Sequence, residues 1–318
     1  MRLFDLHADI GYDIIQKKKQ KITKDVIKNY HVEKFHKGEI AFICMASFFE
    51  GKETWDEMKD MISSTRKEID DCDAVDLVLT REDLEKDTGN VKAIMSVEGM
   101  CGIHDEPREK IRWMYAQGVR LASLCWNDEN DLATGVKGNL EHGLHPLGRE
   151  VVEEMISLNM IIDVSHTNEK TFWDIMSYKD AHVIATHSNI RDLCNHPRNL
   201  WKQQAEAILD RGGLIGMNSA PAFISEHVEE RDCEHLVNHV KWIKDFRGNV
   251  DGIACGFDFM DFYDDADIYG AITDLSNATQ AQNFVDELYH QGFDASQVEQ
   301  ICFKNAIHVV SKAYENRL

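Results

Sequence analysis

Six residues that can bind a metal ion or carry a proton stand at the ends of short apolar runs spread along the chain. Imidazole nitrogens and carboxylate oxygens are ligands that zinc and similar divalent ions take in proteins. Three histidines with up to three carboxylates are too many for one tetrahedral ion but suit two ions that share a bridging carboxylate. Such a pair polarises an amide carbonyl and lowers the pKa of an attacking water, so the set indicates hydrolysis. The six residues are His7, Asp9, Glu98, His166, His187 and Asp258.

Eight apolar runs rich in Val and Ile alternate with longer segments of helical periodicity, and these elements must position the six residues. Runs of this length suit strands that are covered on both faces. Eight strands alternating with helices predict an α/β fold, a parallel sheet closed into a (β/α)8 TIM-like barrel. Gly118 and Gly212 stand just before two of the runs, where helix C-caps belong. The runs cover residues 3–7, 40–49, 91–97, 119–125, 160–164, 182–186, 214–218 and 252–257.

The six candidate residues all fall at the carboxyl ends of predicted strands, which is the end where barrel enzymes carry their active sites. Each residue alone has an ordinary interpretation. A histidine at a strand end is more often a hydrogen-bonded structural residue than a ligand, and Asp258 could cap the segment that follows it. Their joint position at one end of different strands favours a metal centre.

The composition limits the class of partner. Lys and Arg number 35 against 56 Asp and Glu, so the formal charge is −21, which argues against binding to nucleic acid or to anionic membranes. We find no signal-peptide pattern and no apolar stretch long enough to cross a bilayer. The eight cysteines are scattered, which predicts reduced, mostly buried thiols and a cytoplasmic protein. We expect one domain over residues 1–318, with a lysine-rich surface excursion at about 16–30.

Other catalytic motifs are missing from the sequence. It contains no G-x-S-x-G elbow, no phosphate-binding G-x-x-x-x-G-K-[ST] loop and no His-Glu-x-x-His helix. A serine hydrolase, a P-loop enzyme and a helix-borne zinc protease are therefore disfavoured.

An ordered set of segments resembles the membrane dipeptidase (renal dipeptidase) family of zinc metallopeptidases, and more closely its soluble bacterial members. The resemblance covers most of the chain and implies a barrel of the metal-dependent hydrolase type. The matching segments are residues 7–9, 33–49, 96–99, 143–148, 160–166, 186–188, 197–200, 212–218 and 256–259.

The resemblance implies how the metal ligands divide between two Zn²⁺ ions, although other divalent metals suit the same ligands. His7 and Asp9 would bind one ion, and His166 and His187 would bind the other. Glu98 would bridge both ions, and a metal-bridging hydroxide would attack the peptide bond of a dipeptide. A homodimer is also implied.

The resemblance also implies roles for residues that do not bind metal. Asp258 would be the general acid/base that takes a proton from the attacking water and passes it to the leaving amine. Arg198 would hold a substrate carboxylate or the developing oxyanion; without the resemblance, a surface salt bridge explains Arg198 equally well. Trp126 stands where the renal enzymes have a histidine that holds the reacting carbonyl, so we assign Trp126 to substrate binding. Residues 218–221 and 202–203 also depart from the family pattern, which leaves the substrate preference open.

Two alternatives remain. One is an amidohydrolase that acts on another small amide, such as an N-acyl amino acid. Broader amidohydrolase barrels usually begin with His-x-His, whereas this chain has His7-Ala8-Asp9, which favours the dipeptidase. The other is a catalytically silent metal-binding barrel, and the presence of all six candidate residues argues against it.

Overall fold

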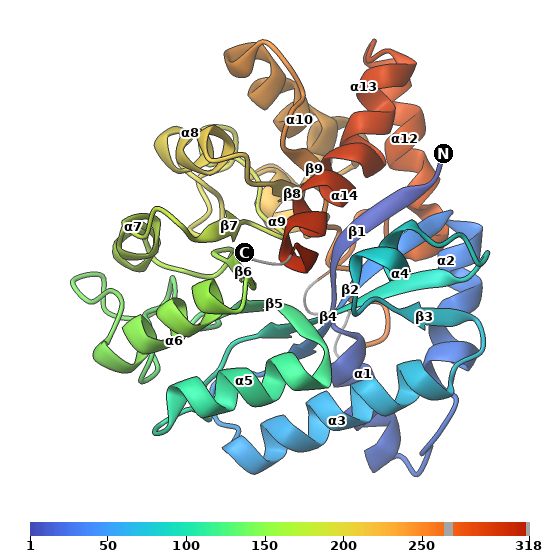
Figure 1. Cartoon of the computed structure of the whole chain (residues 1–318). Helices are drawn as coiled ribbons and strands as arrows, with labels where there is room; N and C mark the ends of the chain where they lie inside the picture. The colour runs from blue at the N-terminus through green and yellow to red at the C-terminus, as the bar shows by residue number, and fades with distance from the viewer. Residues whose placement is uncertain (264–269, 316–318) are drawn as a thin grey trace. The chain divides into compact units, whose positions relative to one another are not determined.

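The computed structural model describes residues 1–263 and 270–315, whose helices and strands are labelled in Figure 1. The chain divides into two compact units whose segments alternate along the sequence. The first unit comprises Met1–Ala8, Lys28–Ile43 and Ala185–Val309. The second comprises Asp9–Ile27, Cys44–Ile184 and the chain from Val310 on. Strand β2 (Ile40–Phe48) runs from the first unit into the second.

Three parallel strands form the sheet of the first unit, in the order β1 (Leu3–Ala8), β9 (Ile253–Cys255), β8 (Ile215–Met217). Asp5 of β1 lies opposite Cys255, and Ile215 of β8 lies opposite Ile253. The helices that lie wholly or mainly in this unit are α2 (Glu33–Lys37), α8 (Lys202–Asp210), α9 (Pro221–Ile224), α10 (Cys233–Arg247), α12 (Ala281–His290), α13 (Ala295–Glu299) and α14 (Asn305–Val310), with the short turns η1 (Ile27–Val32), η2 (Val228–Glu230), η3 (Ala278–Gln280) and η4 (Gln300–Lys304).

Aromatic side chains fill the core of the first unit. The ring of Phe42 stacks on Phe4 of β1 at 5.2 Å between centroids and meets Phe303 edge-on at 5.4 Å. Phe257, which follows β9, contacts Phe284 of α12 in the same edge-on way. These contacts attach the strands to the C-terminal helices, so the strand ends that carry candidate residues have a rigid base.

Five parallel strands belong wholly to the second unit. Their order is β7 (His182–Ile184), β6 (Ile161–Asp163), β5 (Val119–Ser123), β4 (Val91–Glu98), and β3 (Val75–Leu77) pairs with β4. The pairs are in parallel register, with Glu98 opposite Ser123. The helices of this unit are α1 (Ile10–Lys19), α3 (Trp55–Asp71), α4 (Arg81–Glu85), α5 (Pro107–Gln117), α6 (Pro146–Ser157) and α7 (Glu169–Met176), with the turn η5 (Ser311–Tyr314).

The helices of the second unit begin and pack as their sequences dictate. Thr54 and Glu57 form a reciprocal capping box at the start of α3, which satisfies backbone N–H groups that the helix itself cannot pair. Helix α3 buries Met58, Met61 and Ile62 on one face. Helices α5 and α6 are joined by an ion pair of 2.7 Å between Arg112 and the buried carboxylate of Glu154.

All eight predicted strands are present, so the strand pattern is confirmed, while the three-residue strand β3 was not predicted. Gly118 adopts a φ of +108° as the C-cap of α5, and Gly212 a φ of +67° after α8, as expected for residues that end helices. All eight cysteines are buried and none forms a disulfide, which confirms the expectation of reduced thiols.

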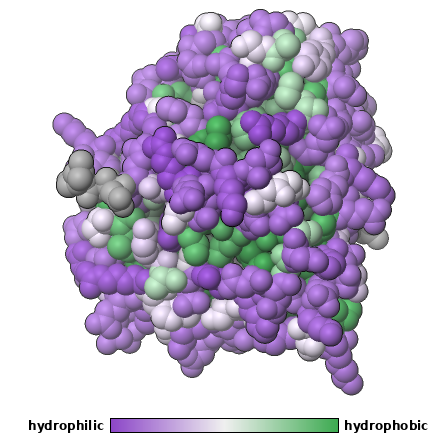
Figure 2. Space-filling view, turned by 45° about the vertical axis from the view of Figure 1, so that its right-hand side comes forward, coloured by the Kyte–Doolittle hydropathy of each residue, from purple (hydrophilic) through white to green (hydrophobic). Residues whose placement is uncertain are grey.

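The surface shown in Figure 2 is predominantly hydrophilic, as the large excess of acidic residues requires. Among the described residues, no helix combines the length and the apolar character needed to cross a membrane. In the predicted surface excursion at 16–30, most side chains are exposed or partly exposed. Val26 and Ile27 are buried, and the carboxylate of Glu68 accepts both of their backbone N–H groups at 2.8 and 3.4 Å.

Two glycines allow the chain just before His187 to approach β8 and β9. A Cβ at Gly216 would lie 1.9 Å from the carbonyl oxygen of Thr186, and one at Gly256 would lie 1.7 Å from the same atom. We predict that Gly256→Ala lowers the free energy of unfolding by about 3 kcal/mol, because backbone atoms must move to admit the methyl group. The measurement is urea unfolding. Gly248→Ala is the control, since its Cβ would meet no atom within 4 Å and should cost only the strain of its φ of +76°, about 1 kcal/mol.

Candidate metal centre

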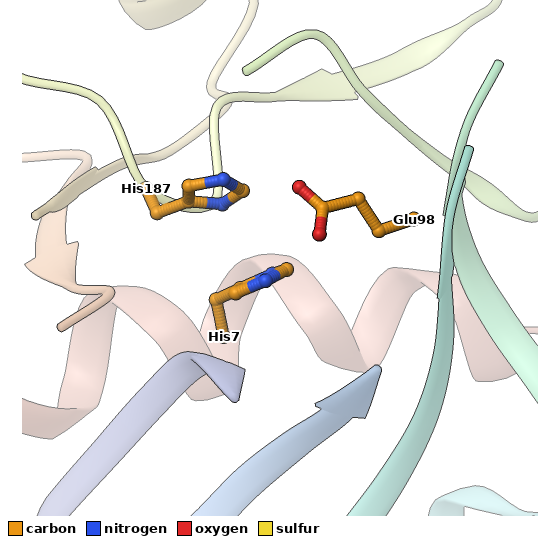
Figure 3. A group of neighbouring side chains, drawn as sticks. All are labelled: His7, Glu98 and His187. Atoms are coloured by element: carbon orange, nitrogen blue, oxygen red, sulfur yellow. The ribbon is translucent and has the colours of Figure 1, made fainter. Parts of the chain in front are cut away.

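Two buried histidines lie against each other in the first unit. His7 comes from the end of β1, and His187 follows the segment that Gly216 and Gly256 accommodate. Their ring centroids are 3.9 Å apart with planes inclined by 35°, and Figure 3 shows the two rings side by side. Their side chains are 2% and 1% exposed, and ligand nitrogens of the two lie within 4.8 Å of each other. Two imidazoles in this position can present nitrogens to a common metal site.

The carboxylate of Asp258 faces the same histidines. One of its oxygens lies 3.9 Å from His7 Nε2, and the amide of Asn218 donates a hydrogen bond of 3.2 Å to the other. Asn218 is fully buried and also donates to the carbonyl oxygen of His187 at 3.3 Å. Asp258 has a φ of +58°, a left-handed conformation that costs energy and recurs at functional sites. The arrangement holds a carboxylate in one orientation beside the imidazole pair.

Backbone and side-chain hydrogen bonds fix the segments that carry these residues. The buried carboxylate of Asp5 accepts the backbone N–H of His7 at 3.3 Å and that of Phe257 at 3.0 Å. It therefore connects the end of β1 to the loop that bears Asp258. Burial raises the pKa of Asp5 to about 6, against the opposing effect of these two hydrogen bonds. The hydroxyl of Thr186 lies 2.6 Å from His187 Nδ1 and orients that ring.

A glutamate and a histidine are in contact in the second unit. Glu98 is the last residue of β4, where its side chain appears in Figure 3, and His166 follows β6. Their side chains are buried, and His166 Nε2 is in contact with a Glu98 oxygen. His166 Nδ1 lies 3.1 Å from Asn127 Oδ1, an atom that can only accept, so Nδ1 carries the hydrogen. In a neutral ring Nε2 is then an electron-pair donor facing a second donor, and only a proton or a metal ion between them makes this contact favourable.

Asp9 and Trp126 are the other candidate residues of this unit. Asp9 is buried at the N-cap of α1, yet its side chain makes no capping hydrogen bond, so the usual structural role of such an aspartate is not filled. Trp126 is partly exposed, and its ring lies 6.0 Å from the ring of His166. Phe48 meets Trp126 edge-on at 5.2 Å and supports it from β2.

Arg198 is buried in the first unit. Its guanidinium carbon lies 5.4 Å from the ring centroid of Phe223, and its backbone N–H donates to His196 Nδ1 at 3.2 Å. The neighbouring Asn199 donates to the carbonyl oxygens of Cys194 and Phe223, which fixes the loop. A buried guanidinium on a fixed loop suits recognition of a carboxylate.

A cavity of about 350 Å³ opens beside Asp258 within the first unit. It is lined by the two carboxylates of Asp258 and Asp261 and by small and apolar side chains that include Ala220, Phe259 and Leu275. This volume lies at the lower end of the range for small-molecule sites, so it suits a small substrate or part of one.

Sequence reasoning missed the residues that orient the candidates. Asn127 holds His166, Asn218 holds Asp258, Thr186 orients His187 and Asp5 fixes two strand ends. Three of the four stand at or next to predicted strand ends, which is the only signal that pointed to them. A polar residue next to a candidate ligand at the end of a strand is therefore a candidate for the hydrogen bond that orients that ligand.

A buried histidine of the first unit, His239, predicts that the free energy of unfolding depends on pH. Nδ1 of His239 in α10 accepts the backbone N–H of Ile190 at 3.1 Å, and its Nε2–H donates to Ile224 at 3.0 Å. Burial lowers the pKa of His239 from 6.5 to about 4, so the folded state binds fewer protons than the unfolded chain between these values. The free energy of unfolding should therefore fall, by about 3 kcal/mol at most, as the pH drops from 6.5 to 4.

Urea unfolding of chelated protein at pH 7 and 4.5 measures this effect without a contribution from metal release. His239→Gln should be less stable at pH 7 but should lose less stability on acidification. An equal loss in both proteins would assign the acid sensitivity to other groups.

Several known proteins resemble this chain in sequence or in fold. A sequence model of the membrane dipeptidase family (peptidase family M19) matches residues 1–318. An "uncharacterized protein in pqqA 5'region" of Klebsiella pneumoniae is 29% identical over 269 residues, which are 81% of this chain and 94% of that protein. Dipeptidase tcpJ of Claviceps purpurea is 28% identical over 227 residues, and the match covers 70% of this chain but only 51% of the fungal protein.

Solved structures resemble the chain over nearly its whole length. A metallo peptidase of Rhodobacter sphaeroides, liganded with a phosphinate mimic of the dipeptide L-Ala-D-Ala, aligns with a TM-score of 0.84 at 20% identity, covering 98% of this chain and 99% of that one. An amidohydrolase of Pseudomonas aeruginosa aligns with a TM-score of 0.79 at 20% identity, covering 89% and 92%.

Proposed function

The chain belongs to the membrane dipeptidase family, and on that premise we propose that it hydrolyses dipeptides with two zinc ions as cofactors. The match over residues 1–318 confirms the resemblance that the sequence motifs indicated. The likeness to solved structures confirms the fold, a (β/α)8 TIM-like barrel. Members of this family are metal-dependent peptidases, so the prediction of an enzyme that cleaves peptide bonds is confirmed at the level of the family.

We propose that the ligands divide as the family pattern implies. His7 and Asp9 would hold one ion, His166 and His187 the other, and Glu98 would bridge the two. The observation that carries the proposal is the contact between His166 Nε2 and a Glu98 oxygen, two buried atoms that require either a proton or a metal ion between them. The adjacent imidazoles of His7 and His187, with ring centroids 3.9 Å apart, support it from the first unit.

The two ions, when bound, would polarise the scissile carbonyl and lower the pKa of the attacking water so that it reacts as hydroxide. Asp258 would accept the proton of that water and return it to the leaving amine. The amide of Asn218 occupies one oxygen of Asp258, so the oxygen that faces His7 is the one assigned to proton transfer. Arg198 would bind the substrate's carboxylate or the developing oxyanion, and Trp126 would line the substrate site.

The proposed substrates are dipeptides, with tolerance for a D-residue at the second position. The Rhodobacter relative holds a mimic of such a peptide, and the cavity beside Asp258 is of a size for a small side chain. A homodimer, a cytoplasmic location and the absence of a nucleic-acid partner stay predictions, as does the single domain.

Hydrolysis of a substrate panel tests the proposal. The panel contains L,L- and L,D-dipeptides, the corresponding tripeptides and N-acyl amino acids, each given to zinc-loaded and to chelated protein. We expect cleavage of dipeptides only, and only by the zinc-loaded protein. Cleavage of N-acyl amino acids alone would indicate an amidohydrolase of another class. A metal-loaded protein that cleaves nothing would indicate a silent metal-binding barrel.

A further inference from the structure

Lys137 lies beside the substrate-side candidate Trp126 in the second unit and has no assigned role. Its ammonium nitrogen is 5.6 Å from the centroid of the Trp126 indole, and the same indole lies 6.0 Å from the ring of the proposed metal ligand His166. The backbone ties these residues together. Lys137 N–H donates to the carbonyl of Asn127 at 2.7 Å, and the N–H of Val136 donates to the carbonyl of His166 at 3.0 Å. Backbone hydrogen bonds thus connect the segment that carries Lys137 to Asn127 and to the proposed metal ligand His166.

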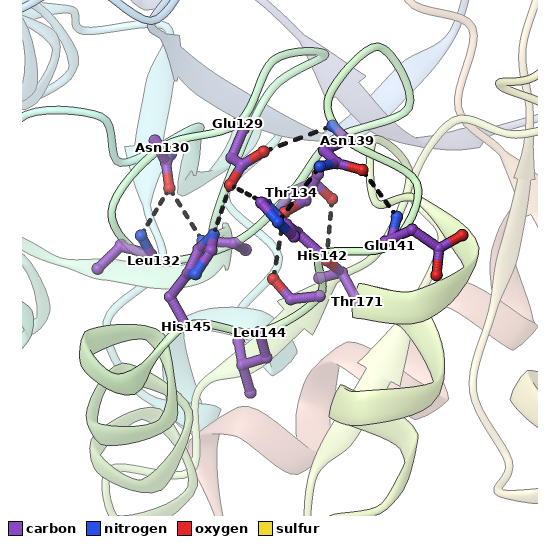
Figure 4. A network of polar contacts seen from close by, with 12 residues as sticks. Glu129, Asn130, Leu132, Thr134, Asn139, Glu141, His142, Leu144, His145 and Thr171 are labelled. Atoms are coloured by element: carbon purple, nitrogen blue, oxygen red, sulfur yellow. Dashed lines mark hydrogen bonds and ion pairs between the residues drawn. The ribbon is translucent and has the colours of Figure 1, made fainter.

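Hydrogen bonds and ion pairs of Glu129 and Asn168 stabilise the loop that carries Lys137. Figure 4 shows the carboxylate of Glu129 between the rings of His142 and His145, at 2.7 and 3.1 Å from their nitrogens. Glu129 also accepts the backbone N–H of Asn139, and the side chain of Asn168 donates to the carbonyls of Asn139 and His142. The hydrogen bond from His142 is the main cause that lowers the pKa of Glu129, which keeps this carboxylate ionised. The network stabilises the loop, so the backbone position from which the Lys137 side chain extends is supported on the protein side.

The ammonium of Lys137 forms no ion pair within the described part of the chain. Glu129 is occupied by His142 and His145, and Asp131 pairs with His104 at 2.7 Å. Among residues 1–263 and 270–315, no carboxylate forms an ion pair with Lys137, and no acceptor binds the indole N–H of Trp126. In a protein with a formal charge of −21, an ammonium that forms no ion pair among the described residues is suited to an anionic ligand.

We propose that Lys137 and the indole N–H of Trp126 bind the carboxylate of an acidic substrate side chain, so that dipeptides containing Asp or Glu are preferred. His166 is buried, Trp126 is partly exposed and Lys137 is exposed, so the ammonium lies at the outer end of this series. The main-chain carboxylate of a dipeptide is bonded to the carbon next to the scissile nitrogen and must stay near the reacting centre. A side-chain carboxylate reaches further outward. This inference rests on the proposed dipeptidase function.

The test compares isosteric acid and amide substrates. For wild-type enzyme, kcat/KM for Ala-Glu should exceed that for Ala-Gln about three- to five-fold, the range of a solvent-exposed ion pair, and Glu-Ala against Gln-Ala identifies the position. Lys137→Met should bring the preferred ratio toward one, Lys137→Arg should keep it, and Lys137→Glu should invert it. Trp126→Phe should reduce the ratio in part, since only the N–H donor is lost. Lys86→Met, which removes an exposed lysine after α4, is the control for net charge.

Binding is measured in parallel on an Asp258→Asn background, by titration calorimetry with the same four peptides. If no peptide is hydrolysed, the proposed function fails, but a preference for acidic peptides that Lys137→Met abolishes would still support the binding site. An acid-to-amide ratio near one in wild type, or one that Lys137→Met leaves intact, would overturn the inference. An equal rise in KM for acid and amide peptides in Lys137→Met would also overturn it, because Lys137 would then serve the main-chain carboxylate.

Discussion

Asp258→Asn is expected to lower kcat by about 10²- to 10⁴-fold, the usual contribution of a general acid/base, while the metal content stays at the wild-type level. Asparagine cannot accept the proton of the attacking water. It can still take the hydrogen bond from Asn218, and it tolerates the φ of +58° better than most residues, so the loop should keep its shape. The measurement is steady-state kinetics on a dipeptide together with metal analysis by mass spectrometry.

The metal analysis distinguishes two roles for this carboxylate. An oxygen of Asp258 lies within 4.8 Å of a His7 nitrogen, a separation that metal ligands can also have. If Asp258 binds metal, Asp258→Asn will lose both metal and activity. Asp251→Asn is the matched control, because Asp251 precedes β9 where Asp258 follows it, and is exposed. Full activity in Asp258→Asn would show that another group moves the proton.

The sequence was sufficient to locate the strands because each is an apolar run bounded by polar or glycine residues. The predicted run at 160–164 is observed as β6 (Ile161–Asp163), because apolar residues continue past the last paired position. Strand β3 lies in a short run, residues 74–79, that the charged Asp76 interrupts, and it was not predicted. It is three residues long, and a tertiary ion pair holds it: Asp76 accepts hydrogen bonds from Lys92 at 2.7 Å and from Asn90 at 2.9 Å. Contacts of this kind depend on which strand becomes the neighbour, which local pattern does not encode.

In the candidate site, too, some residues could be predicted from the sequence and others could not. His7, His187 and Asp258 were predicted from strand ends, and the structure brings them together in one unit. The residues that orient them were not predicted. Asn218 serves Asp258 from a different strand, so the pair is created by the packing of β8 beside β9 and not by sequence spacing. A supporting hydrogen bond depends on distance and direction after folding, and neither is visible in residue type alone.

Glu98→Gln is expected to lower metal affinity by at least about 100-fold and to abolish most activity. Removal of a residue that only hydrogen-bonds a metal ligand costs up to about 100-fold, and loss of a ligand itself should cost more. The amide keeps the size of the side chain but loses the negative charge that a bridging ligand brings to two cations. In chelated protein the same change removes a buried charge in contact with His166, so the unfolding temperature without metal should stay near the wild-type value.

The stabilisation by metal therefore separates a ligand role from a structural one. Zinc at 100 times its dissociation constant should stabilise the wild-type protein by about 2.7 kcal/mol for each ion bound, and Glu98→Gln should lose most of the resulting rise in unfolding temperature. Glu82→Gln, an exposed glutamate in α4, should behave as wild type with and without zinc. Glu98→Gln could instead lower the unfolding temperature of the chelated protein by as much as it lowers the increase caused by zinc. In that case the Glu98–His166 contact would be a structural pair that shares a proton. If Glu98→Gln kept full metal content and activity, the bridging role would be wrong, and the centre would have to rest on the histidines with Asp9 and Asp258.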